Sequence, residues 1–184
     1  MENKSLVTKK ICFLAMGIAL YVVLSTTVNI PLIGHIRVDA GYLVFGAFIS
    51  YFGITGTVVG VVGCLFESLL FSGWIPVGWM VGQMVIGLIC GICYKSIQRK
   101  EKNARLKRVY YVIVTVIAVL IGIVIIKTFI ECVLYQIPFP VKVVKNLIAA
   151  ITDTIMMSAG VLMAERFRKK AQVKMYGKSE LPAD

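Results

Sequence analysis

Several long apolar stretches of this 184-residue chain contain ionisable or amide side chains. Glu67, Lys127 and Asp153 are the clearest cases, because the residues around them are mostly aliphatic or aromatic. An ionisable group inside a membrane is costly and usually serves a function. Groups of this kind can hold a polar ligand when they line a shared cavity. We therefore treat them as candidates for a ligand-binding site.

Residues that would support catalysis or metal binding are scarce. His35 is the only histidine, and only Cys90 and Cys93 among the five cysteines lie close together in the sequence. That pair has the spacing of a redox motif, but it lies in an apolar stretch without a βαβ pattern, so we interpret both residues as packing residues. The phosphate-binding pattern G-x-x-x-x-G-K-[ST] does not occur. We predict a non-catalytic protein without a cofactor or a metal site.

The stretches that carry these residues have the composition of membrane helices. The chain is 59% apolar, its mean hydropathy is +0.87, and 16% of its residues are charged, against about 25% in soluble domains. A membrane-spanning helix needs about 20 residues. We predict an all-α integral membrane domain over residues 1–170 and a cytoplasmic tail over 171–184. The six predicted helices cover residues 11–28, 36–53, 54–71, 77–94, 109–130 and 141–165.

The basic residues predict the orientation of these helices. Sixteen of the twenty Lys and Arg residues lie in segments 4–10, 95–108 and 166–178. Cytoplasmic loops of membrane proteins are rich in Lys and Arg, so we predict that both termini are cytoplasmic. The net charge of +11 indicates contact with anionic lipid rather than nucleic acid, because no nucleic-acid recognition module accompanies the basic residues.

This orientation places the candidate polar residues in the outer half of the membrane. Helical spacing puts Lys142, Lys145, Asn146, Ala149 and Asp153 on one face of the last predicted helix. Four basic residues, Arg37, Lys127, Lys142 and Lys145, balance four acidic residues, Asp39, Glu67, Glu131 and Asp153. This balance favours a neutral or zwitterionic ligand, and the aromatic candidates suit a flat ring. The predicted substrate-binding residues are Arg37, Asp39, Glu67, Trp79, Gln83, Lys127, Glu131, Tyr135, Lys145, Asn146 and Asp153.

Structural roles remain open for several of these residues. Lys142 can reach the outer interface as a snorkelling side chain. Trp79 can belong to an interfacial aromatic belt, and Lys127 with Glu131 can form a structural i,i+4 ion pair. Asp153 is predicted near mid-depth, where its short side chain cannot reach water.

Three segments resemble a known family of transporter subunits. Ala15-Met-Gly-Ile-Ala19 resembles a scaffold-contact motif, residues 29–39 resemble a first outer loop, and residues 46–60 resemble the passage between the second and third helices. With the chain length and the predicted topology, they resemble the substrate-binding S component of an energy-coupling factor (ECF) transporter.

The resemblance implies a mechanism and a set of partners. An S component binds a vitamin or similar micronutrient from outside and delivers it with a transmembrane scaffold subunit and two ATPase subunits in the plasma membrane of a prokaryote. Ala15 and Ala19 would form the partner interface. The ligand could be riboflavin-like, pyridoxine-like or a queuosine precursor.

Two other classes fit the size of the chain. An MreD-like membrane scaffold without transport activity has a similar length and number of helices, but it needs no converging polar residues. A small integral-membrane enzyme would be expected to carry a His/Asp/Glu cluster, which the sequence lacks.

Overall fold

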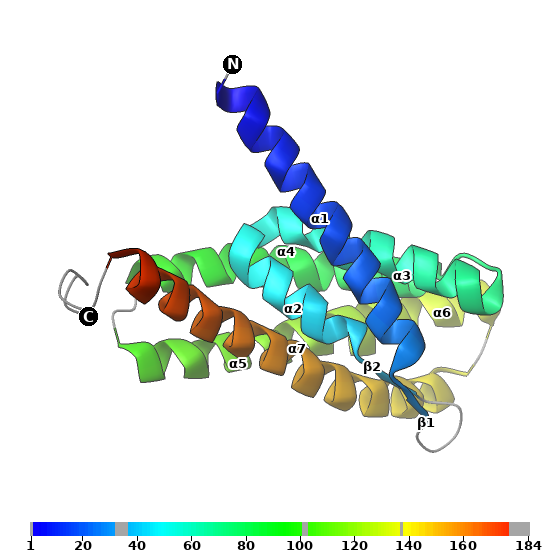
Figure 1. Cartoon of the computed structure of the whole chain (residues 1–184). Helices are drawn as coiled ribbons and strands as arrows, with labels where there is room; N and C mark the ends of the chain where they lie inside the picture. The colour runs from blue at the N-terminus through cyan, green and yellow to red at the C-terminus, as the bar shows by residue number, and fades with distance from the viewer. Residues whose placement is uncertain (1, 32–36, 101–102, 137, 177–184) are drawn as a thin grey trace.

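A computed structural model of the chain describes residues 2–31, 37–100, 103–136 and 138–176. Apart from one two-stranded hairpin, the described elements are helices, and α1 crosses the others at a steep angle (Figure 1). The elements are α1 (Glu2–Thr27), β1 (Asn29–Pro31), β2 (Arg37–Asp39), α2 (Gly41–Phe52), η2 (Gly53–Gly56), α3 (Thr57–Ser72), α4 (Val77–Lys100), α5 (Ala104–Val119), η3 (Leu120–Lys127), α6 (Thr128–Tyr135) and α7 (Phe139–Tyr176).

Five helical stretches among the described residues are long and apolar enough to cross a membrane. This composition agrees with the predicted class, an all-α membrane protein. The second stretch has 32 residues, which is more than one crossing of about 20 residues needs. The five stretches are Val7–Thr27, Gly41–Ser72, Val77–Arg99, Ala104–Tyr135 and Phe139–Arg168.

The second stretch reverses direction in its middle, at η2. Gly53 has a φ of 61° and donates its amide N–H to the carbonyl of Ile49, which ends α2; a positive φ is easily adopted only by glycine. Gly56 then packs against the backbone of Phe48, and Gly60 packs against the ring of Phe45. The order of these contacts makes α2 and α3 an antiparallel pair (Figure 1).

The structure corrects several predicted helix boundaries. The second helix begins at Gly41 rather than near residue 36, because Arg37–Asp39 pairs as a strand with Asn29–Pro31. The fifth predicted helix covers Ala104–Tyr135 through a π-helical segment at η3. The last helix continues to Tyr176, so residues 171–176 of the predicted tail are helical, and residues 177–184 lie outside the described part of the chain.

The core forms where α2 packs against α7. Tyr42, Phe45 and Ile49 of α2 are fully buried. A Cβ atom added to Gly46 or to Gly160 would overlap with the backbone of the opposite helix, so two small residues allow α2 and α7 to approach closely. The close packing of these helices fixes the position of the start of α2 relative to the first half of α7, which carries Lys145, Asn146 and Asp153.

Basic residues gather at the other end of the helices. Lys10 of α1, Lys95 and Arg99 of α4 line one surface hollow beside the η2 turn. Arg168 of α7 donates a hydrogen bond to the carbonyl of Ser50, 2.7 Å away, at the end of α2. Residues from all three basic segments of the sequence therefore lie at the η2 end. The buried charged residues Glu67, Lys127, Glu131 and Asp153 lie toward the hairpin end of the same helices.

Candidate ligand cavity

A cavity of about 290 Å³ lies at the hairpin end of the protein. Its walls come from β2, the C-terminal half of α3, the connection to α4, the start of α4 and the first half of α7. This volume is at the lower end of the range for small-molecule sites, about 300–1,000 Å³. The lining residues are Asp39, Cys64, Glu67, Ser68, Ser72, Trp74, Pro76, Trp79, Gln83, Lys145, Asn146, Ala149 and Asp153.

Asp39 is fixed at the cavity by donors from two elements. Tyr21 of α1 donates its hydroxyl to Oδ2 at 3.1 Å, and Ser25, one turn further along α1, donates to Oδ1. The backbone N–H of Gly41 also donates to Oδ1, at 2.8 Å. The Asp39 carboxylate therefore joins the first helix to the start of α2 and holds the hairpin end of the fold in place.

The orientation of the Gln83 amide follows from the same network. Tyr21 has one hydroxyl hydrogen, which it donates to Asp39, so its oxygen must act as the acceptor toward Gln83. The Gln83 amide nitrogen donates that bond at 2.8 Å. This requirement sets the orientation of the amide group. The Gln83 carbonyl oxygen is then the group that remains for another partner.

Two polar atoms on the cavity lining have no hydrogen-bond partner within the described residues. They are Oε1 of Gln83 and Oδ2 of Asp153. Both residues are 1% exposed, so bulk water does not satisfy them. A buried polar atom without a partner costs about 1–3 kcal/mol, and such atoms in native proteins call for an explanation such as a missing ligand.

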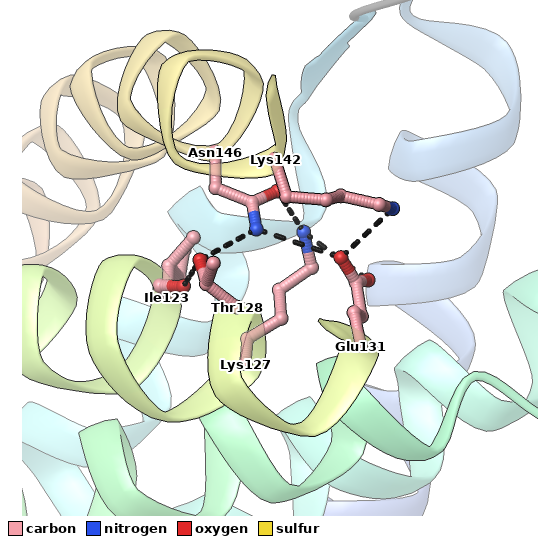
Figure 2. Close-up of polar contacts among 6 residues, drawn as sticks. All are labelled: Ile123, Lys127, Thr128, Glu131, Lys142 and Asn146. Atoms are coloured by element: carbon pink, nitrogen blue, oxygen red, sulfur yellow. Dashed lines mark hydrogen bonds and ion pairs between the residues drawn. The ribbon is translucent and has the colours of Figure 1, made fainter. Parts of the chain in front are cut away.

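A second polar cluster lies beside the cavity and joins α6 to α7 (Figure 2). The Lys127 ammonium donates to Oδ1 of Asn146 at 2.5 Å and pairs with Glu131 at 3.5 Å. Lys142 pairs with the other oxygen of Glu131 at 3.0 Å. Asn146 uses its Nδ2 group toward Thr128 at 2.8 Å and toward Glu131 at 3.5 Å. The functional groups of this cluster therefore satisfy one another.

Aromatic side chains connect the cluster to the cavity. The Lys127 ammonium lies 3.7 Å from the centroid of the Trp79 ring, a cation–π contact, and Trp79 also lines the cavity. Trp74 lines the cavity as well and meets the ring of Tyr135 edge-on, with 5.6 Å between centroids. The cavity therefore has two indole rings in its lining.

The structure separates the predicted site residues into two groups. Asp39, Glu67, Trp79, Gln83, Lys145, Asn146 and Asp153 line the cavity. Asn146 also belongs to the cluster in Figure 2, together with Lys127 and Glu131. Lys127, Glu131 and Tyr135, which contacts Trp74, are not among the lining residues. The backbone of Arg37 lies in β2, and its side chain lies outside the described part of the structure.

Sequence reasoning missed the two residues that hold Asp39 in place. Tyr21 and Ser25 are four residues apart and are buried, so they lie on one face of α1. That spacing of polar residues in an apolar helix is the signal that could have identified them. Ala15 and Ala19, the predicted partner contact, are exposed on α1.

The described residues contain no group of three or more His, Cys, Asp or Glu residues that could hold a metal ion. The fold is that of a helical membrane protein with a polar cavity at one end. A family model described as "ECF-type riboflavin transporter, S component" matches residues 5–164. The chain therefore belongs to this family of non-catalytic transporter subunits, which supersedes both the MreD-like scaffold and the membrane enzyme as its class.

Bacterial relatives cover most of the chain. It is 26% identical to a UPF0397 protein of Lactobacillus acidophilus over 158 residues, which is 84% of this chain and 85% of that protein. A UPF0397 protein of Lactobacillus helveticus is 22% identical over 171 residues, 91% of this chain and 92% of the relative. A UPF0397 protein of Streptococcus thermophilus is 30% identical over 97 residues, 52% of each chain.

Proposed function

We propose that this chain captures a small heteroaromatic micronutrient in the cavity and delivers it across a bacterial plasma membrane. Family membership makes it a substrate-binding transporter subunit. The observation that carries the proposal is the pair of unpartnered acceptors on Gln83 and Asp153, both buried and both on the cavity lining. A bound ligand would satisfy these atoms and remove the cost of leaving them unpaired.

The proposed topology has six crossings, with both termini in the cytoplasm. The reversal at η2 divides the 32-residue stretch into α2 and α3, which adds one crossing to the five stretches. The basic residues at the η2 end then face the cytoplasm, and the cavity faces outward. The 12 residues of α2 are fewer than a straight crossing needs, so β2 would complete the passage to the outer surface.

The proposed ligand is a flat heteroaromatic compound, and three classes of such compounds fit the cavity. Riboflavin appears in the family description, and the names of the UPF0397 relatives state no ligand. Two indole rings in a cavity of about 290 Å³ suit a flat ring system. Riboflavin-like compounds, pyridoxine-like compounds and queuosine precursors all remain candidates.

The proposed partners are a transmembrane scaffold subunit and two ATPase subunits, which would supply the ATP hydrolysis. Ala15 and Ala19 lie four residues apart on α1 and are exposed. Small residues at this spacing let another helix approach closely, and the exposure of both leaves that face accessible. We therefore place the scaffold contact on this face of α1.

Ligand binding and uptake, measured together, test the proposal. The purified chain is screened against a panel of micronutrients, and its own ligand should raise the unfolding temperature. At a thousandfold excess over Kd, that ligand should stabilise the folded state by about 4 kcal/mol. Ala15→Trp or Ala19→Trp should keep this stabilisation but abolish uptake and co-purification with the ATPase subunits. Leu20→Trp, an exposed position on another face of α1, should retain both. Loss of binding in the alanine variants would place these residues in internal packing instead.

Cysteine labelling tests the topology. In a variant without the natural cysteines, Ile75→Cys lies in the exposed connection before α4, and Arg105→Cys lies in the first turn of α5. A membrane-impermeant thiol reagent should label Ile75→Cys in intact cells and Arg105→Cys only after permeabilisation. Labelling of Arg105→Cys in intact cells would reverse the proposed orientation.

A further inference from the structure

The unpartnered polar atoms on the cavity lining share one property, which is that they accept hydrogen bonds. The Gln83 amide nitrogen donates to Tyr21, so the amide oxygen, Oε1, is the atom left without a partner. An amide oxygen can only accept a hydrogen bond. Oδ2 of Asp153 belongs to a carboxyl group that accepts when ionised. A ligand that brings hydrogen-bond donors to this space would satisfy both Gln83 Oε1 and an ionised Asp153.

Two of the donor groups near these acceptors are committed to other partners. The Asn146 amide nitrogen donates to Thr128 and Glu131. The Lys127 ammonium is engaged by Asn146, Glu131 and the Trp79 ring. Because these groups satisfy one another, they do not compete with a ligand for the acceptors on Gln83 and Asp153.

We propose that the cavity selects a flat, cationic nitrogen heterocycle whose amino or ring N–H groups point toward Gln83 and Asp153. The inference rests on the proposed function and specifies its ligand class. The structure records no ion pair of Asp153 among the described residues. A buried carboxylate without a cation is costly, so a cationic donor gains more from this site than a neutral one.

The rest of the lining fits such a ligand. The indole rings of Trp74 and Trp79 line the cavity. The Lys127 ammonium occupies one face of Trp79, and the ring surface that remains would attract a flat cation through the ring quadrupole. Lys145 is the one lysine among the lining residues and is exposed, so water and salt screen its charge. The exposed part of the lining therefore carries an ammonium group, and the buried part carries hydrogen-bond acceptors. This arrangement would orient a ligand with its donor groups pointing inward.

The sequence-based expectation of a neutral or zwitterionic ligand counted charged residues that the fold places outside the cavity. Lys127, Lys142 and Glu131 pair with one another in the neighbouring cluster, and none of them is a lining residue. When the charged residues are grouped by their contacts rather than by their depth in the membrane, the expected ligand changes from neutral or zwitterionic to cationic.

A matched series of ligands on one ring tests this inference. Pyridoxamine, pyridoxine and 4-pyridoxate share a pyridine ring and differ at one substituent, which is an ammonium, a hydroxyl or a carboxylate. Titrations of the purified full-length chain in detergent should give a Kd for pyridoxamine roughly tenfold or more below that for pyridoxine, because charge-assisted hydrogen bonds are the stronger ones. No binding of 4-pyridoxate is expected.

Two variants of α7 assign the preference to a residue. Asp153→Asn keeps the size of the side chain and should weaken pyridoxamine binding about 10- to 100-fold, with little change for pyridoxine. Ser158→Ala is the matched control, since Ser158 also carries a buried hydroxyl without a partner in the described residues but does not line the cavity. It should change the binding of neither compound, and unfolding temperatures without ligand verify that both variants fold.

The possible results separate the inference from the function. Tighter binding of pyridoxine or 4-pyridoxate than of pyridoxamine would overturn the cation preference and leave ligand capture intact. Equal losses in Asp153→Asn and Ser158→Ala would overturn the assignment to Asp153. If none of the three compounds binds, the inference fails, and co-purification with the ATPase subunits shows whether the proposed function fails as well.

Discussion

Two neighbouring polar regions of this protein use similar residues in different ways. In the cluster of Lys127, Glu131, Lys142, Asn146 and Thr128, each functional group meets a partner within the chain (Figure 2). On the cavity lining, acceptor atoms of two side chains have no partner among the described residues. Polarity inside a membrane helix therefore does not by itself identify a binding site, because the polar groups of the first region satisfy one another. The partners of each polar atom make the distinction.

The largest effect that this comparison predicts is a loss of stability in the satisfied cluster. Glu131→Gln removes the carboxylate shared by Lys127 and Lys142 and keeps the side-chain volume. Removing one partner of a buried ion pair costs about 3–5 kcal/mol, because the remaining charge is left uncompensated. We expect a loss near 3 kcal/mol in the free energy of unfolding, measured by denaturant titration in detergent.

Lys142→Met is the control for this prediction. The Lys142 side chain is 22% exposed, and Glu131 keeps its contacts with Lys127 and Asn146. The expected loss is below about 1 kcal/mol, as for partly exposed pairs. Similar losses in both variants would mean that the cluster is not a buried, mutually compensated unit, and the contrast between the two regions would fail.

The next largest effect has the opposite sign and lies on the cavity lining. Asp153→Leu replaces a buried carboxyl group with an apolar side chain of similar size. Because Oδ2 has no hydrogen-bond partner in the described structure, the change removes an unsatisfied group and should raise the stability of the ligand-free chain by about 1–3 kcal/mol. The same denaturant titration measures the gain. A clear loss of stability would show that Asp153 is satisfied within the chain.

Part of this arrangement could be predicted from the sequence. The spacing of Lys145, Asn146 and Asp153 places them on one face of α7, and the structure puts all three at the cavity. The i,i+4 spacing of Lys127 and Glu131 likewise matches an observed ion pair. Both predictions depend only on the helical repeat, which is a local property of the sequence.

The division between the cavity and the cluster could not be predicted, because it depends on how helices are rotated against one another. The π-helical segment Leu120–Lys127 interrupts the regular α-helical repeat just before α6, and such segments change the direction of the side chains that follow. Lys127 contacts Asn146 and the Trp79 ring from a position beside the cavity. The pairing of Asn29–Pro31 with Arg37–Asp39 could not be predicted either, because strands of three residues are too short to show a periodic pattern.

A smaller effect on stability than that of Glu131→Gln gives the sharpest test of the comparison, since it uses two buried tyrosines, Tyr21 and Tyr94. Tyr21 links Gln83 to Asp39, whereas Tyr94 shares a hydrogen bond of 2.5 Å with Thr115, away from the cavity. Tyr21→Phe and Tyr94→Phe each remove one hydroxyl and should each cost about 1–2 kcal/mol of unfolding free energy.

Only the change at Tyr21 should alter ligand binding. Without its hydroxyl, the Gln83 amide loses the contact that fixes its orientation and can turn its nitrogen toward the cavity, where it would present a donor in place of an acceptor. The affinity for a donor-bearing ligand should therefore fall about tenfold in Tyr21→Phe and stay unchanged in Tyr94→Phe, as measured by titration of both variants. Equal affinities would mean that the orientation of Gln83 does not depend on Tyr21, and the acceptor character of the lining would then rest on Asp153 alone.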